Sequence, residues 1–382
     1  MKTTAKIFSP IIWVSHEINL SGANYSLLEF MQEMKEAGAK QLLVVHMPGT
    51  MSERAIMLGF DVVFIKSYGW VRHRGEPFFN NGFFKRLVRN QVAFFKFLLI
   101  FMQHRPKLVV SFTSTTYIAA LASSMAGIRH YYRISEFGEK DFGFRLAWGK
   151  WAYAFMNAVS DKILVNSKAV FEQYVQFIKP DKIAVVYNSV HLNRPIERKQ
   201  ASDRGKASRL LLMGQIIPSK GHLDALEALV YLREKGLFPV LTIAGKQIMP
   251  EYVSELDSFI EMNNLCDQVK FVNFTPDKEL LLEECDILLM CSVSEAFGRV
   301  TAEAMKAMVP VIGADAGGTK ELIIHGVTGL LYQPGNAREL AARIEAIEMG
   351  IADAVSLAEN AFRHINDLTS AANRLKYFCL TD

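Results

Sequence analysis

The stretch "DILLMCSVSEAFGRVTAEAMKAM", residues 286–308, contains an apolar run, a short polar loop and a helical pattern, in that order. The run "DILLMC" is typical of a buried strand, and Gly298 can adopt backbone angles that other residues avoid. We therefore predict a strand that leads through a tight loop to the N-terminus of a helix. That end of a helix carries unpaired backbone N–H groups and the positive pole of the helix dipole, so it attracts anions such as phosphate.

Glu295 and Glu303 flank this predicted helix start, eight positions apart. An ionised carboxylate only accepts hydrogen bonds, so two of them facing one cleft suit hydroxyl-rich ligands such as sugars and riboses. The alternative is that both glutamates only complement the helix dipole and cap the backbone. The spacing alone leaves both interpretations open.

Short apolar runs alternate with helical stretches along the whole chain. In the first half the runs are "KIFSPIIWV", "QLLVVH", "DVVFI", "KLVVSF", "HYYRI", "DKILVN" and "KIAVVY", and in the second half "RLLLMG", "PVLTIAG", "QVKFVN", "DILLMC" and "PVIGA". Strands that alternate with helices indicate doubly wound parallel sheets. The predicted fold class is therefore α/β, with two Rossmann-like domains whose strand ends face an interdomain cleft.

The length of 382 residues suits two cores, and half of the residues are hydrophobic. The polar stretch 191–208 lacks periodicity and predicts a linker between an N-terminal domain, residues 1–190, and a C-terminal domain, residues 209–364. We expect residues 365–382 to form a C-terminal helix that packs back toward the first domain. The four cysteines include no CxxC pair, which is typical of a protein of the reducing cytosol.

The net charge of +4 hides an asymmetry along the chain. Residues 1–200 hold 26 Lys and Arg against 14 Asp and Glu, whereas residues 201–382 hold 17 against 25. A basic first domain indicates an anionic partner. The basic residues concentrate in residues 70–107, where Arg72, Arg74, Lys85, Arg86, Arg89 and Lys96 interleave with Phe78, Phe79, Phe83, Phe84, Phe94, Phe95 and Phe97.

This basic and aromatic segment resembles an amphipathic surface that binds an anionic membrane. The alternative is a core helix with a solvated basic face. Nucleic acid is not expected as a partner, because no recognised RNA-binding motif accompanies the segment. No window reaches the ~18 to 20 uninterrupted apolar residues of a membrane span, so we expect a cytoplasmic protein that is peripheral on the inner face of the membrane.

Several blocks of the chain together resemble the retaining glycosyltransferases of family 4, which have the two-domain fold called GT-B. Residues 286–308 contain that family's Glu-x7-Glu motif, and "PVIGADAGGTKELIIHGVTGLLYQPGN" looks like its downstream block. The stretch "LLMGQIIPSKGHLDALEAL" is similar to the loop that opens the family's second domain, "SGANYSLLEF" to its glycine loop, and "KIAVVYNSV" to the segment before its linker. A lone Glu-x7-Glu would be weak, but these blocks in order cover nearly the whole chain.

The resemblance implies roles for individual residues. Glu303 would hold the ribose of a nucleotide-diphosphate sugar, and Glu295 would hold the sugar to be transferred. Lys220 would place an ammonium on the diphosphate, which makes Glu295 and Lys220 the catalytic candidates. The diphosphate would also meet the backbone near a further set of residues: Phe297, Gly298, Arg299, Gly214, Gly22 and Ala23.

Two positions depart from the family pattern. The family commonly has an arginine after Gly214, where this chain has Gln215, so phosphate binding would depend more on Lys220, on backbone amides and on Arg299. Many members also have a histidine near the end of a strand in the first domain. Here that strand reads "HYYRISEFGEKDF", which makes Arg133 and Glu136 the acceptor-side candidates, with a salt bridge inside the domain as the alternative.

Retaining transfer in this family is thought to need no protein nucleophile, because the departing phosphate can take the proton of the acceptor. The chain has no Asp-x-Asp sequence, so we expect neither a metal nor another cofactor. The resemblance implies a glycan or lipid-linked acceptor in surface polysaccharide biosynthesis. Alternatives are a non-catalytic sugar-nucleotide-binding or membrane scaffold protein, and an epimerase or phosphorylase of the same fold.

Overall fold

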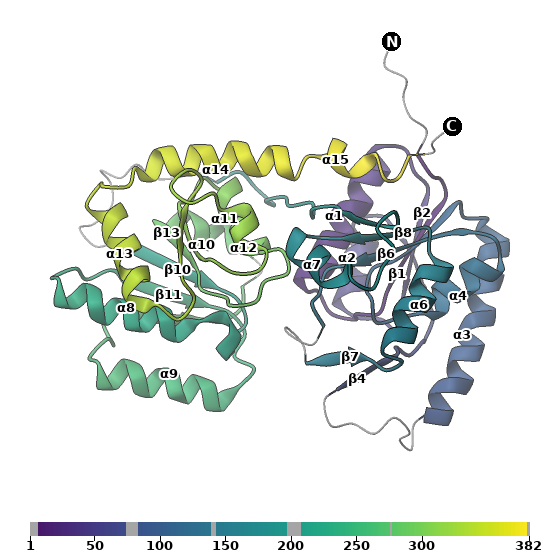
Figure 1. Ribbon diagram of the computed structural model, residues 1–382, viewed down its shortest axis with the longest axis horizontal. Helices are drawn as coiled ribbons and strands as arrows, with labels where there is room; N and C mark the ends of the chain where they lie inside the picture. Colours follow the sequence, from purple (N-terminus) through teal and green to yellow (C-terminus); the bar gives the residue numbers. More distant parts are fainter. Residues whose placement is uncertain (1–6, 74–82, 139–142, 197–207, 276, 380–382) are drawn as a thin grey trace, which may run out of the picture. The chain divides into compact units, whose positions relative to one another are not determined.

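The computed structural model describes residues 7–73, 83–138, 143–196, 208–275 and 277–379. The chain forms two compact units, one of Met1–Ser189 with Thr369–Asp382 and one of Val190–Leu368 (Figure 1). Each unit is built on one parallel β-sheet with helices in the connections between strands. This arrangement confirms the predicted α/β class.

The sheet of the first unit has seven parallel strands in the order β3-β2-β1-β5-β6-β8-β9. The apolar runs predicted as strands in the first half all form this sheet, because each supplies side chains to a buried face. The strands are β1 (Ile11–Ser15), β2 (Gln41–Val45), β3 (Asp61–Phe64), β5 (Leu108–Ser111), β6 (Arg129–Ile134), β8 (Lys162–Val165) and β9 (Ile183–Val185). A short antiparallel pair, β4 (Val71–His73) and β7 (Phe144–Leu146), was not predicted.

All but the last of the described helices of the first unit lie in connections between strands. They are α1 (Gly22–Glu36), α2 (Thr50–Met57), α3 (Phe83–His104), α4 (Ile118–Met125), α6 (Lys150–Val159), α7 (Lys168–Tyr174) and α15 (Ala371–Leu375). In Figure 1, α3 and α4 lie next to each other along one side of this unit.

The end of the chain belongs to the core of the first unit. The ring of Phe378 lies 5.7 Å from that of Trp13 and 6.1 Å from that of Phe30, measured between centroids. Arg374 of α15 donates through Nε to Glu33 of α1 at 2.8 Å, and both side chains are buried. The segment 365–382 is therefore not the single helix that we predicted, because α14 ends at Leu368 and α15 begins at Ala371.

The sheet of the second unit has six parallel strands in the order β12-β11-β10-β13-β14-β15. They are β10 (Arg209–Met213), β11 (Val240–Ala244), β12 (Val269–Val272), β13 (Ile287–Met290), β14 (Val311–Ala314) and β15 (Leu330–Tyr332), of which the short β15 was not predicted. The helices are η2 (Pro218–Lys220), α8 (His222–Glu234), α9 (Pro250–Met262), α10 (Lys278–Glu284), α11 (Arg299–Lys306), α12 (Thr319–Leu322), α13 (Ala337–Glu348) and α14 (Ala354–Leu368).

Two of the predicted segments are described only in part. Residues 197–207 of the predicted linker lie outside the described residues, but its start is fixed to α10, since the backbone N–H of Asn193 donates to Glu279 at 2.7 Å. In the basic segment 70–107, residues 74–82 lie outside the described residues, and with them Arg74, Phe78 and Phe79. The side chains of Phe83 and Phe84 are likewise not described. Among the helices of the described ranges, none combines the length and apolar character needed to cross a membrane.

Candidate functional site

The carboxyl ends of β10, β13 and β14 lie side by side in the second unit, because these strands are parallel neighbours. The loops 214–221, 292–298 and 315–318 follow them. Ligands of doubly wound sheets bind at this edge. Most of the residues that the sequence singled out for donor binding lie in these three loops or just after them.

Residues 286–308 fold as predicted, as strand β13, a loop and helix α11. Gly298 precedes the first helical residue with φ of 85°, a left-handed conformation that glycine adopts readily. Phe297 is buried, so its ring is covered by the protein, and its part in phosphate binding stays a prediction. The N-terminal end of α11 carries the positive pole of the helix dipole, so this end can bind an anion.

Lys220 and Glu295 form an ion pair, although they are 75 positions apart. The hydroxyl of Ser292 donates to the same carboxylate oxygen at 3.0 Å. The exposed fraction of the side chain is 24% for Lys220 and 16% for Glu295, so both reach the surface. The site thus places an ammonium beside a carboxylate, which suits a ligand with an anionic group next to a hydroxyl.

Two glycines let the site loops approach each other this closely. A Cβ at Gly221, where φ is 69°, would lie 2.2 Å from the carbonyl oxygen of Cys291. A Cβ at Gly317, where φ is 52°, would lie 2.5 Å from the carbonyl oxygen of Glu295. That oxygen accepts a hydrogen bond from the backbone N–H of Gly318 at 2.6 Å. The positions of Lys220 and Glu295 therefore depend on residues that have no side chain.

Glu303 lies in α11 and is held by two cations. Its Oε1 is 2.5 Å from Nζ of Lys278 and 2.7 Å from Nε of Arg299, and only 4% of the Glu303 side chain is exposed. The sequence did not single out Lys278, which is the first residue of the short helix α10 and belongs to no motif that we used. These contacts fix the carboxylate of Glu303 at the start of α11.

Gln215, the residue in place of the family arginine, is exposed at the carboxyl end of β10. Gly214 donates its N–H to Ala244 at 2.9 Å, and Ile216 donates to the carbonyl of Lys246 at 3.0 Å, so the loop after β10 lies against the loop after β11. Lys246 is exposed there and was not anticipated. It supplies a cation in the loop beside Gln215.

Gly22 and Ala23 begin α1 in the first unit, where the Oγ of Ser21 caps the helix by accepting from the N–H of Asn24. The side chain of Asn24 donates to Glu17 at 3.1 Å and accepts from the hydroxyl of Ser15 at 3.1 Å. The loop between β1 and α1 is thereby fixed. The part of Gly22 and Ala23 in phosphate binding stays a prediction.

Arg133, an acceptor-side candidate, lies in the core instead of at the surface. It is 1% exposed, its Nη2 donates to Asn188 at 2.6 Å, and its guanidinium lies 5.4 Å from the ring centre of Phe30. Burial lowers the pKa of Arg133 to about 9. This burial favours the alternative of an interaction inside the domain, and the acceptor-side role of Arg133 stays a prediction.

Glu136, the second acceptor-side candidate, is also buried. Its Oε1 accepts from both the N–H and the hydroxyl of Ser114 at 2.7 Å, and its Oε2 accepts from the N–H of Ser135 at 2.9 Å. These bonds tie the loop after β5 to the end of β6. The contacts therefore support a structural role for Glu136.

His130 lies inside β6 and is fully buried. Its ring nitrogens lie 2.9 Å from Oγ of Ser111 and 3.1 Å from Oγ of Ser160. Burial lowers the pKa of His130 to about 3.

Two protein-family models match the chain. "Glycosyltransferase Family 4" matches residues 20–194, and "Glycosyl transferases group 1" matches residues 193–364. The human alpha-1,3/1,6-mannosyltransferase ALG2 is 30% identical over 204 residues, which are 48% of this chain and 49% of the relative. The amylovoran biosynthesis glycosyltransferase AmsK of Erwinia amylovora is 34% identical over 155 residues, 38% of this chain and 37% of the relative. The chain thus spans half or less of the length of these relatives.

Solved structures resemble nearly the whole chain. Anabaena Alr3699/HepE in complex with UDP-glucose has a TM-score of 0.77 at 22% identity, covering 97% of this chain and 98% of that one. A glycosyltransferase of Rickettsia africae has a TM-score of 0.77 at 18% identity, covering 97% and 96%. At these identities the likeness concerns the fold.

Proposed function

Because the chain belongs to the glycosyltransferases of family 4, we propose that it transfers a sugar from a nucleotide-diphosphate donor to a hydroxyl of a glycan or lipid-linked acceptor, with retention of configuration. The observation that carries the proposal is the ion pair of Lys220 and Glu295 at the sheet edge where α11 begins. An ammonium and the positive pole of a helix N-terminus favour a diphosphate, and the neighbouring carboxylate favours sugar hydroxyls.

Each residue has a distinct part in this proposal. Glu303, held by Lys278 and Arg299, accepts hydrogen bonds from the ribose hydroxyls. Glu295 accepts hydrogen bonds from hydroxyls of the sugar. Lys220 and the N-terminus of α11 face the diphosphate, whose negative charge grows as the bond to the sugar breaks, so they stabilise the transition state more than the bound donor.

The same groups supply the charge that a metal ion would supply in other sugar-nucleotide enzymes. We infer that neither a metal nor another cofactor is required, because Lys220, Lys246 and the helix N-terminus present positive charge at one sheet edge. Turnover should then be unchanged by a chelator. A loss of turnover in EDTA that Mg²⁺ or Mn²⁺ restores would contradict this part.

The choice of a sugar nucleotide as donor, and of a polysaccharide pathway, is supported by similar proteins. HepE has been crystallised with UDP-glucose, and AmsK carries the name of a polysaccharide biosynthesis enzyme. We accordingly propose a nucleotide-sugar donor and a role in surface polysaccharide biosynthesis. The basic first half of the chain supports a peripheral location on the anionic inner face of the membrane, where a lipid-linked acceptor would be found.

The test begins with a panel of UDP-, GDP- and other nucleotide sugars. A ligand that binds only the folded protein must raise its melting temperature, so the stabilising sugar identifies the donor. Incubation of that donor with candidate acceptors should release the nucleoside diphosphate and add one sugar to the acceptor mass. NMR of the product should show the anomeric configuration of the donor. Stabilisation without any transfer or hydrolysis would favour a non-catalytic binding protein, and an inverted product would refute retention.

A further inference from the structure

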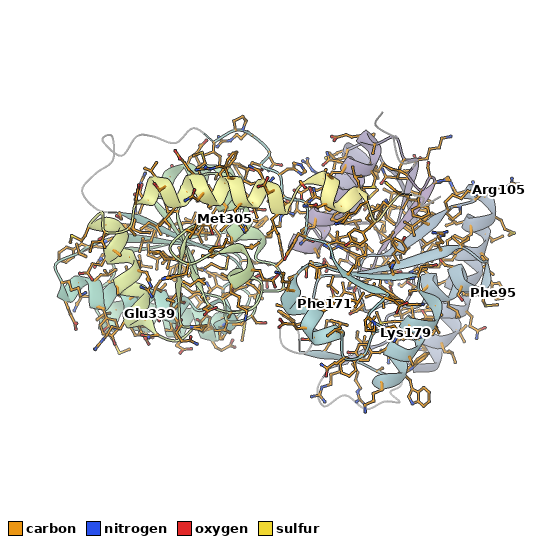
Figure 2. All side chains as sticks on the ribbon, turned by 45° about the horizontal axis from the view of Figure 1, so that its top comes forward. Phe95, Arg105, Phe171, Lys179, Met305 and Glu339 are labelled. Carbon is orange, nitrogen blue, oxygen red and sulfur yellow. The ribbon has the colours of Figure 1, made fainter. Side chains whose placement is uncertain are left out.

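Helix α3 of the first unit presents an apolar stripe to solvent. Its members recur at alternating spacings of four and three residues, so they share one face of the helix. Their exposed fractions run from 52 to 66%, and they are Val88, Val92, Phe95, Leu99 and Met102. Figure 2 shows Phe95 on the outer side of this helix, with Arg105 close to its end. We refer to these five residues as the α3 stripe.

The α3 stripe is separate from the face that holds the helix in place. Ala93, Phe97 and Phe101 are between 1 and 3% exposed and pack with Val109 of β5 and Ile118 of α4. This inner face anchors the helix to the rest of the unit. The sequence analysis left open a core helix with a solvated basic face. The inner face of α3 is indeed part of the core, but the opposite face is apolar.

The charged residues of helix α3 are all basic. Helix α3 contains no Asp or Glu. Lys85 and Lys96 of the helix are exposed, as is Arg105 directly after it. An apolar stripe with a basic border and no acidic residue on its helix is the composition that binds at the interface of anionic bilayers. The helix of 22 residues is about 33 Å long, so the stripe can lie along a membrane surface.

We propose that the α3 stripe enters the headgroup region of an anionic lipid bilayer while Lys85, Lys96 and Arg105 bind lipid phosphates. This inference names the surface that serves the peripheral location in the proposed function, and it is independent of catalysis. A second copy of the chain is a poorer occupant, because two α3 helices packed together would bring basic residues near each other with no acidic residue on either helix.

The test is flotation of the whole protein with vesicles of phosphatidylcholine, with or without phosphatidylglycerol. The stripe variant is Phe95→Gln with Leu99→Gln, and the basic variant is Lys85→Gln with Lys96→Gln. The control is Met57→Gln with Met262→Gln, since these methionines are 78 and 74% exposed and lie on other helices. Circular dichroism and melting temperature should be unchanged in all three, because every substituted side chain is exposed.

Wild type and control should float with the anionic vesicles. With neutral vesicles they should stay unbound in the bottom fraction. The stripe variant should bind anionic vesicles at least about tenfold more weakly, because it has lost two large apolar side chains that would move from water into the bilayer. The basic variant should bind more weakly and lose part of the salt dependence, since fewer charges are screened.

Equal binding by wild type and the stripe variant would overturn the proposal. So would a stripe substitution that turns an oligomer into a monomer and leaves vesicle binding intact, because the stripe would then be a protein interface. Thermal stabilisation by the nucleotide sugar is measured on each variant and should not change. Vesicle binding by a protein that no nucleotide sugar stabilises would refute the proposed transfer and leave this surface in place.

Discussion

The pair Glu295 and Glu303 gives the sharpest test of the site. We predict that Glu303→Gln weakens binding of a nucleoside diphosphate, whereas Glu295→Gln spares that binding and lowers transfer. Both substitutions keep the size of the side chain and remove its charge. The expected difference arises because Glu303 is assigned to the ribose, which every donor nucleotide contains, and Glu295 to the sugar, which the free diphosphate lacks.

The magnitude follows from the chemistry of the lost bonds. A hydrogen bond to a charged group contributes about 1.5 to 3 kcal/mol, and 1.4 kcal/mol corresponds to a factor of ten in Kd. The Kd of the nucleotide should therefore rise about 10- to 100-fold in Glu303→Gln. The substitution also leaves Lys278 and Arg299 beside a neutral amide, so the folded protein should lose about 1 to 3 kcal/mol of stability.

Isothermal titration calorimetry with the nucleoside diphosphate of the donor measures the first effect, and product formation with the complete donor measures the second. The matched control is Glu345→Gln, which also removes a helical glutamate from an ion pair in the second unit, with Lys235. Its binding and turnover should equal those of wild type. Equal nucleotide affinity in wild type and both site variants would refute the assignment, and so would a loss of affinity in Glu295→Gln as large as in Glu303→Gln.

Three further substitutions test the structure and the mechanism. Lys220→Ala should reduce turnover more than donor affinity, because the ammonium meets charge that grows in the transition state, and unchanged turnover would show that another group stabilises the phosphate. Arg374→Ala should destabilise the first unit by about 3 to 5 kcal/mol in urea unfolding, because it leaves Glu33 buried without its partner, and a loss below about 1 kcal/mol would contradict the buried ion pair. His130 has a folded-state pKa of about 3 against 6.5 for the ordinary side chain, so the folded state binds fewer protons and its stability falls as the pH drops below 6.5. The effect should reach about 2 kcal/mol at pH 5, and a His130→Asn protein with the same difference in stability between pH 7 and pH 5 would refute it.

The fold class could be predicted because its signals are local. Each apolar run that we interpreted as a strand forms one, and Gly298 precedes α11 as the residues suggested. A buried strand must be apolar over four or five consecutive residues, and a tight loop requires a residue without a Cβ, so neither depends on distant parts of the chain. The strands β4, β7 and β15 were missed because each covers only three residues and, unlike β9 in "KIAVVY", none lies in a longer apolar run that we interpreted as a strand.

The sequence by itself also predicted the chemistry of the candidate site, because the residue types and order around Glu295 and Glu303 resemble a known motif. Only the tertiary structure decided which partners those residues have. Lys278 reaches Glu303, and Gly317 makes room for the carbonyl of Glu295, through packing of segments that are separate in the chain.

The tertiary structure also decided which side chains are buried. Arg133 follows the same strand pattern as its neighbours, yet it lies among Phe30, Phe112 and Asn188 in the core. The α3 stripe and the inner face of α3 are both apolar, and only packing against β5 and α4 determines which of them is covered. A sequence fixes the character of each side chain, whereas its exposure depends on which distant elements fold against it.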